Sequence, residues 1–266
     1  MTTLILGRPL PDRPGFAATV RSERIKLTSV RSTWWTLAAM VLIGAGGTTL
    51  ICWGNADWLA SSGADESAGS FITWGMMIAQ VCAIVLGTLV VTGEYGTGMI
   101  RSTLAATPMR GRVLAAKAVV LTSVLFVVGT ATALLGYAGG NYFLDRAGVG
   151  LALEGDVAQS MYGNGLFMAG LGLFAGAVGF ILRHTAATLS AVLALMLVVT
   201  NMVLLIPGDT GRWITKLMPG NAGSVVATPV PFNPNLLDAW TGFGVFTAEL
   251  AVLVLGGWLV LRRRDA

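Results

Sequence analysis

Three polar side chains interrupt long apolar stretches of this chain, and they are the first candidates for chemistry. Gln80, Asn201 and Glu249 each stand several residues inside such a stretch. Polar groups in these surroundings usually face protein or a wet pathway and often mark function. Two roles are open for Glu249. One is a structural hydrogen bond between helices, with Asn201 as a candidate partner at similar depth. The other is a cation-attracting or substrate-contacting group on a transport route.

The motifs of the common enzyme classes are absent from the sequence. The chain has one histidine, which excludes the HExxH zinc motif and any multi-histidine metal centre. Neither a phosphate-binding P-loop nor a GxSxG nucleophile elbow occurs. No apolar stretch holds two acids that could form a catalytic dyad. We therefore expect no catalytic residue and no metal site, and the remaining classes are binding, transport and scaffolding.

The composition is typical of a membrane protein. Apolar residues make up 55% of the 266 residues and charged residues only 11%, against about 25% charged in soluble domains. The mean hydropathy is +0.74. A helix needs about 20 apolar residues to cross a bilayer, and we predict an all-α polytopic fold with six spans. Gly172 and Gly176 form a GxxxG motif in the fourth, which favours close helix packing. The predicted spans are 34–53, 71–92, 113–138, 161–182, 186–206 and 243–261.

Lysine and arginine concentrate on one side of these spans. Fourteen of the 17 lie in the N-terminal segment, in two connections or at the C-terminus, and three lie on the other side. Cytoplasmic segments carry the excess of these residues, so we predict that both termini are cytoplasmic and that the net charge of +4 reflects topology rather than nucleic-acid binding. The predicted parts are a tail with an interfacial helix (1–33), a transmembrane domain (34–261) and a second tail (262–266). Lys117 is expected to snorkel to the interface.

The segment 15–31 has the pattern of an amphipathic helix at the cytoplasmic interface. Phe16, Val20, Leu27 and Val30 share one helical face. Glu23 falls within that apolar arc, and a carboxylate facing lipid would be costly. We therefore expect Glu23 to meet a basic partner or to face protein. The helix could serve as a topology anchor alone or as a lever that contacts a cytoplasmic partner.

The segment 93–117 is the longest predicted cytoplasmic connection. It is expected to contain a short helix that starts at Gly96 or Thr97 and ends at Pro108. Its apolar residues, which include Met99 and Ile100, could insert into a groove of a partner protein. The alternative is a solvated loop that is basic only because it is cytoplasmic.

The segment 207–242 connects the last two spans on the outer side. A connection of this length is rarely plain coil. Residues 211–227 are apolar enough to enter the outer leaflet, where a re-entrant segment buried against protein is allowed. It could act as an external gate or as a structured cap without a gating role.

Three sequence runs together resemble a known family. They are SERIKLTSVRSTWWTL, GEYGTGMIRSTLAATPMRGRVLAAK and WITKLMPGNAG. Their order and spacing are similar to those of permease subunits of bacterial ABC exporters of the type-two class. The resemblance extends from about Phe16 to Arg263 and is closest to short six-span permeases of actinobacteria.

The resemblance implies a non-catalytic permease in the bacterial cell membrane. Such a subunit pairs with a second permease, often a copy of itself, and with two separate P-loop ATPase chains that bind ATP and Mg²⁺. The connection between the second and third spans would be the coupling helix, and the external connection would form short gating helices. The residues matched to ATPase coupling are Glu94, Gly96, Thr97, Gly98, Arg101, Pro108 and Arg110, with Arg21, Glu23 and Lys26 in the N-terminal helix.

Two other functions remain open at this point. An ion-coupled secondary transporter or channel subunit would need polar relays deep in the membrane, and Gln80 and Glu249 are the candidates. A membrane anchor or sensor would leave the elaborate 93–117 connection without a purpose. For an exporter, Gln80, Asn201 and Glu249 are the candidate residues of the substrate pathway.

Overall fold

The computed structural model describes residues 15–106 and 109–263. Six helices in these ranges are long and apolar enough to cross a membrane, as predicted. Within the same ranges the chain forms helices and connections without a β-strand. The spanning helices are α2 (Arg31–Leu59), α4 (Trp74–Gly96) preceded by α3 (Ala68–Phe71), α6 (Arg110–Arg146), α7 (Gly155–Leu182), α8 (Thr185–Leu193) with its continuation, and α12 (Ala239–Arg263).

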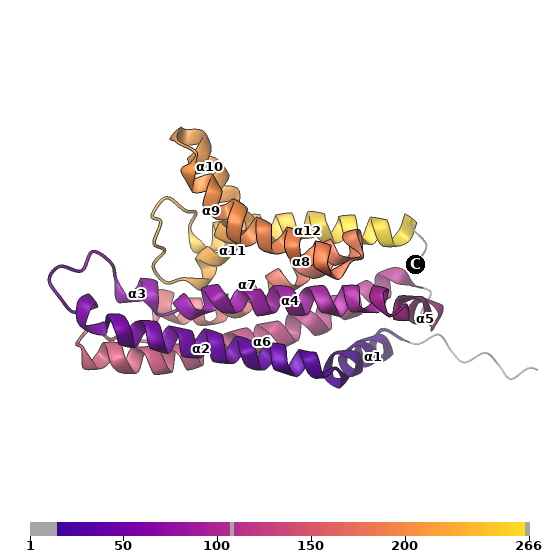
Figure 1. Ribbon diagram of the computed structural model, residues 1–266, viewed down its shortest axis with the longest axis horizontal. Coiled ribbons are helices and arrows are strands. Elements are labelled where there is room, and N and C mark those ends of the chain that lie inside the picture. Colours follow the sequence, from indigo (N-terminus) through magenta and orange to yellow (C-terminus); the bar gives the residue numbers. More distant parts are fainter. Residues whose placement is uncertain (1–14, 107–108, 264–266) are drawn as a thin grey trace, which may run out of the picture.

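Four of these helices form a ring that the other two flank. Helices α2 and α7 each pack against both α4 and α6, while α12 lies along α7 and α8 along α4. Figure 1 shows the long helices running along a shared axis. Their common core contains the fully buried side chains of Ile84, Leu125, Leu171 and Phe246, one from each of α4, α6, α7 and α12.

The two ends of the bundle carry different short elements. Helices α1 (Phe16–Ser29) and α5 (Met99–Ala106) lie at the same end as the C-terminus of α12, whereas α3 and α10 (Gly208–Leu217) lie toward the other end (Figure 1). The end with α1 and α5 also holds most of the basic residues that the described ranges contain, among them Arg21, Arg101 and Arg110. This is the end that the charge distribution predicts to be cytoplasmic.

Glycine permits close contact between α4 and α7. A Cβ atom added to Gly87 of α4 would overlap the backbone of Gly172 in α7, and one added to Gly176 would lie 3.5 Å from the carbonyl oxygen of Gly87. The GxxxG motif therefore lies at the α4–α7 interface, where it was expected to allow close packing.

Helix α6 extends beyond the predicted third span. That span, 113–138, lies within the helix, which continues past Gly139 and Gly140 to Arg146. The two glycines are not a helix end because they face α2, where an added Cβ would meet Thr49 and Cys52. At about 1.5 Å per residue, a helix of 37 residues exceeds a bilayer core of about 30 Å.

The fifth span is irregular near its C-terminal end. Helix α8 passes into the π-helical turn η1 (Ala194–Val199), then α9 (Thr200–Met202) and the 3₁₀ turn η2 (Val203–Leu205). The hydroxyl of Thr200 donates to the carbonyl oxygen of Leu195 at 2.9 Å, which closes the wide turn. π-Helical turns inside α-helices frequently occur at functional sites.

The 207–242 connection forms short helices, as the family resemblance implies. Helix α10 is followed by α11 (Pro219–Ser224) and the 3₁₀ turn η3 (Val225–Ala227). The α11–η3 part is buried, with Val226 completely inaccessible, and packs against α7 and α12. Helix α10 projects from the bundle in Figure 1, and its Trp213 is 60% exposed. The α11–η3 part is thus the more deeply buried, whereas α10 buries only Gly211 and Thr215.

Candidate functional site

Helix α1 docks on the bundle through a stripe that includes a carboxylate. Thr19, Glu23 and Leu27, spaced four residues apart, are its buried side chains. Phe16 and Val30 of the predicted apolar arc are instead 44% and 49% exposed. The helix is therefore present, and the part of the predicted arc that it buries against the bundle is Glu23 and Leu27.

Glu23 finds the basic partner that its position in the sequence requires. Its Oε2 atom accepts a hydrogen bond from Lys117 Nζ of α6 at 2.6 Å, and its Oε1 atom lies 2.7 Å from Lys26 Nζ. Both Glu23 and Lys117 are buried, with side-chain exposures of 3% and 4%. The expectation of a basic partner is confirmed.

Lys117 is fully saturated as a donor. Besides Glu23, its ammonium group contacts Oε1 of Glu94 at 3.0 Å and the carbonyl oxygen of Val90 at 3.1 Å. A protonated lysine has three N–H groups and no acceptor, so every donor is used. Lys117 was predicted to snorkel to the interface. It is buried instead, because Glu23 and Glu94 offer partners inside the protein.

Lys26 makes a second three-way contact. Its ammonium group reaches Glu23 at 2.7 Å, Glu94 Oε1 at 2.9 Å and the hydroxyl of Thr103 at 3.0 Å. Thr103 belongs to α5, so this side chain joins three elements. We call Glu23, Lys26, Glu94 and Lys117 the ion cluster; it unites α1, the end of α4 and the start of α6, and touches α5.

The ion cluster is electrostatically balanced. Burial by itself would raise the pKa of Glu23, but Lys117 and Lys26 outweigh it and hold the pKa below the ordinary 4.5. Burial would likewise lower the pKa of Lys26, but the hydrogen bonds to Glu23 and Glu94 raise it above 10.5. Two carboxylates face two ammonium groups, so the cluster is neutral as a whole. Oε2 of Glu94 is buried without a hydrogen-bond partner.

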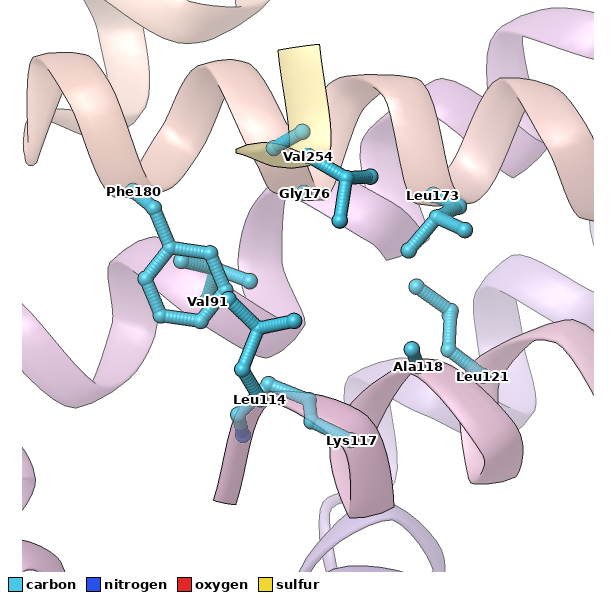
Figure 2. A pocket seen from close by; sticks show the side chains of 10 residues that line it. Val91, Leu114, Lys117, Ala118, Leu121, Leu173, Gly176, Phe180 and Val254 are labelled. Carbon is cyan, nitrogen blue, oxygen red and sulfur yellow. The ribbon is translucent and has the colours of Figure 1, made fainter. Parts of the chain in front are cut away.

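Two cavities adjoin the ion cluster. The larger, of about 330 Å³, is lined by the cluster and by apolar side chains such as Leu86 and Val120. The smaller, of about 20 Å³, is shown in Figure 2, where Lys117 lies beside Leu114, and Leu121 and Phe180 line other parts of the space. That space can hold about one water molecule. Within the described ranges no three His, Cys, Asp or Glu side chains gather as metal ligands would.

The structure separates the residues matched to ATPase coupling into a buried and an exposed group. Glu23, Lys26 and Glu94 meet in the ion cluster. A second group is exposed at the same end of the bundle: Arg21, Gly96, Thr97, Gly98 and Arg101. Pro108 lies outside the described residues.

The predicted short helix begins slightly later than expected. Helix α4 continues through Gly96, Thr97 caps it, and Gly98 turns the chain with a φ of +70° before α5 starts at Met99. Glycine adopts this left-handed conformation without strain. Ile100 of the predicted apolar face is buried, whereas Met99 is 43% exposed.

Arg110 has a different neighbour from the rest of its segment. Its guanidinium donates to the carbonyl oxygens of Leu261 and Arg262 at the end of α12. Carbonyl groups in the last helical turn lack partners within the helix, and a basic side chain there is stabilising. Arg110 thus connects the segment between the second and third spans to the C-terminal helix.

The three candidate pathway residues do not come together. Gln80 and Asn201 line one cavity between α4 and the fifth span, whereas Glu249 is not among its lining residues. Asn201, one candidate partner of Glu249, is exposed and donates to the carbonyl oxygen of Leu197 at 2.6 Å. Oε2 of Glu249 is buried without a hydrogen-bond partner.

Sequence reasoning missed two residues of the ion cluster and its surroundings, Lys117 and Thr103. Lys117 could have been suspected from its charge inside an apolar run, but its partners come from segments 23 and 94 residues away. Nothing in the residues around Thr103 marks it as a ligand of Lys26.

Comparison with known proteins adds no family assignment. No protein-family model matches this chain, and no curated protein matches it. The fold therefore defines the chain as a multi-pass α-helical membrane protein.

Proposed function

We propose that this chain is the transmembrane permease subunit of an ATP-driven exporter. It forms the substrate pathway and couples to separate ATPase chains through the 93–112 segment and α1. It hydrolyses nothing itself; ATP and Mg²⁺ bind to the partner. The proposal rests on the resemblance of the sequence runs and on the position of the ion cluster.

The observation that carries the proposal is that the ion cluster fastens both coupling segments to a spanning helix. Glu23 and Lys26 come from α1, Glu94 from the end of α4, and Lys117 from α6. Breaking a buried ion pair by moving one partner away leaves an uncompensated charge and costs about 3–5 kcal/mol. Force applied to α5 or α1 by a motor would therefore move α6 with them, rather than let them slide.

The surface beyond the ion cluster suits a docked partner. Arg101 and Ser102 of α5 are exposed, as is Arg21 of α1, and Met99 offers a half-exposed apolar side chain. An apolar anchor surrounded by arginines is the composition found where proteins bind each other. In this proposal the α1–α5 end faces the bacterial cytoplasm, two ATPase subunits dock there, and a second permease completes the pathway.

Purification from the native host tests the proposal. The affinity-tagged chain is solubilised with its partners, and the co-purifying chains are identified by mass spectrometry. We expect a soluble chain with a P-loop motif in about equal amount. If no P-loop chain co-purifies under conditions that keep the membrane protein folded, the proposal loses its main support.

One observation favours the alternative, an ion-coupled transporter. Oε2 of Glu249 is buried in α12 without a hydrogen-bond partner, and ionisable groups in spans often belong to ion pathways. Replacing Glu249 with Gln distinguishes the two. Unchanged efflux at normal expression removes Glu249 from transport, whereas loss of efflux that persists at saturating ATP, with dependence on the proton gradient, would favour the alternative.

A further inference from the structure

A cavity of about 220 Å³ lies toward the end of the bundle opposite the ion cluster. It is bounded by the start of α4, by α7, by the turn η1 with α9, and by α11 with η3. Its floor is buried, since Asn164 and Met168 are only 2% and 1% exposed. Its rim is open, since Met77 and Phe232 are 58% and 45% exposed. A ligand could therefore enter from the rim and reach polar groups at the floor.

The polar lining consists of uncharged side chains throughout the described residues. A charged ligand group would lose its hydration there without meeting an opposite charge, and an unpaired buried charge is costly. The cavity is therefore suited to a neutral ligand. It is also smaller than the roughly 300–1,000 Å³ of sites for drug-sized molecules, so it fits a small molecule or the head group of a larger one.

Two amide side chains that line the cavity, those of Gln80 and Asn201, donate hydrogen bonds to the backbone. Nε2 of Gln80 donates to the carbonyl oxygen of Met77 at 2.7 Å, and Nδ2 of Asn201 donates to that of Leu197 at 2.6 Å. Their amide oxygens accept no hydrogen bond from the described residues. Each such oxygen can accept two.

The amide groups of Asn164 and Asn221 also donate to backbone carbonyl oxygens. Nδ2 of Asn164 donates to the carbonyl oxygens of Ser160 and Ala227, at 2.8 and 2.7 Å. Nδ2 of Asn221 donates to that of Thr215 at 2.9 Å. All four amide groups thus keep their oxygen for a ligand, with two acceptor sites each, whereas Gln80, Asn201 and Asn221 keep only one N–H each and Asn164 keeps none.

The hydroxyl groups of the lining reinforce this bias. Thr200 donates to Leu195, Ser224 to the carbonyl oxygen of Asn221, and Thr228 to that of Ser224. A hydroxyl has one donor and two acceptor sites, so these three groups retain acceptors. Acceptor sites therefore outnumber free donors among these side chains, and the cavity suits a ligand that carries hydroxyl groups.

The apolar part of the lining is rich in methionine. Met76, Met77, Met168 and Met196 all contribute to it. Methionine side chains are flexible and adapt to irregular apolar ligands. Met196 belongs to the π-helical turn η1, and such turns are frequent at functional sites.

We infer that this cavity binds the neutral, hydroxyl-bearing head group of an amphiphile. The hydroxyls donate to the amide oxygens of Gln80, Asn164, Asn201 and Asn221, and the apolar body contacts the methionines and leaves the cavity at the rim beside Met77. That this amphiphile is the exported substrate rests on the proposed function; the binding itself does not.

Photo-crosslinking without any ATPase tests the inference. The purified chain is placed in phosphatidylcholine nanodiscs with a diazirine-bearing monoacylglycerol, whose head group carries two hydroxyls. Matched probes carry the same acyl chain with a trimethylammonium or a phosphate head. We expect the glycerol probe to label cavity-lining peptides of α4, η1 and α11, and excess unlabelled monoacylglycerol to suppress this labelling. Equal labelling by all three probes would overturn the inference.

A matched pair of variants sharpens the test. Asn201→Leu removes one acceptor, and it should reduce cavity labelling about two- to tenfold, as one lost hydrogen bond implies. Asn55→Leu is the control, because Asn55 of α2 also donates to the carbonyl four residues earlier, that of Ile51, but lies outside the cavity lining. Equal effects of the two variants would contradict the inference.

The source of the hydroxyls is distinguished by a soluble competitor. If excess sorbitol suppresses labelling as well as monoacylglycerol does, a free polyol satisfies the site; if only monoacylglycerol does, the apolar body is required. Both results support the acceptor-lined site, whereas suppression by neither overturns it. If no ATPase co-purifies with the chain but the cavity is still labelled, the proposed function is refuted and the binding site stands.

Discussion

Lys117 Nζ lies 2.6 Å from Glu23 Oε2, although the two residues are 94 positions apart and are only 4% and 3% exposed. One belongs to a spanning helix and the other to the helix that precedes the first span. The contact fixes α1 on α6 at a defined register, because neither charge can leave the other without remaining buried and unpaired.

Removing Lys117 should destabilise the protein strongly. Lys117→Met leaves Glu23 and Glu94 with Lys26 as their shared cation, so one buried negative charge is uncompensated. The expected loss is about 3–5 kcal/mol in the free energy of unfolding, which thermal unfolding in detergent would detect as a lowered Tm. The double variant Glu23→Gln with Lys117→Met restores neutrality and should recover part of the loss; a double variant as unstable as the sum of the singles would contradict a coupled pair.

The stability of α1 docking should have a broad plateau in pH. The pKa of Glu23 is below the ordinary 4.5, so its contribution is complete above pH 4.5 and is lost as the pH falls through the lowered pKa. The pKa of Lys26 is above 10.5, so its contribution is complete below pH 10.5 and is lost as the pH rises through the raised pKa. Thermal unfolding followed across pH checks this. Glu23→Gln should weaken the acid limb selectively, and an unchanged acid limb would count against the assignment.

Arg110 should hold the end of α12. Its guanidinium donates to the carbonyl oxygens of Leu261 and Arg262, and Arg110→Ala removes these bonds. We expect faster amide hydrogen exchange in the last two turns of α12, with exchange in the middle of α12 unchanged. Arg110→Lys keeps the charge but loses the fork of donors, so it should give an intermediate rate. Equal exchange rates in the last two turns of α12 in the parent protein and in both variants would argue against this role.

The contact between Gly87 and Gly172 should not tolerate a methyl group. An added Cβ on Gly87 would overlap the backbone of Gly172, so Gly87→Ala must push α4 and α7 apart at a cost of about 1–3 kcal/mol. Gly54→Ala in α2 is the control, because a Cβ added to Gly54 would have no neighbour within 4 Å among the described residues. Comparable melting temperatures for the two variants would show that the helices are not packed this closely.

Some of these features could be read from the sequence and others could not. Six spans follow from apolar length, and a basic partner for Glu23 follows from the cost of a carboxylate on an apolar face. The identity of that partner does not follow, because it depends on how α1 meets α6. Local patterns were misleading for Lys117, which the rule for snorkelling assigns to the interface.

Contacts between small residues are a second feature that local patterns do not give. Gly139 and Gly140 allow α6 to pass close to Thr49 and Cys52 of α2. The relation of Asn201 to Glu249 could not be derived from depth for a related reason. Equal depth places two residues in one layer, but only the rotation of each helix decides whether they face each other.

The central claim, that α5 docks on a separate motor, is tested most directly by site-specific photo-crosslinking in the native host. Benzoylphenylalanine replaces either Ser102, exposed on α5, or Ser61, exposed beyond the end of α2 at the opposite end of the bundle. We predict that the Ser102 position forms an adduct with a chain that carries a P-loop and that the Ser61 position does not. Adducts with that chain from neither position, or from both equally, would contradict the account.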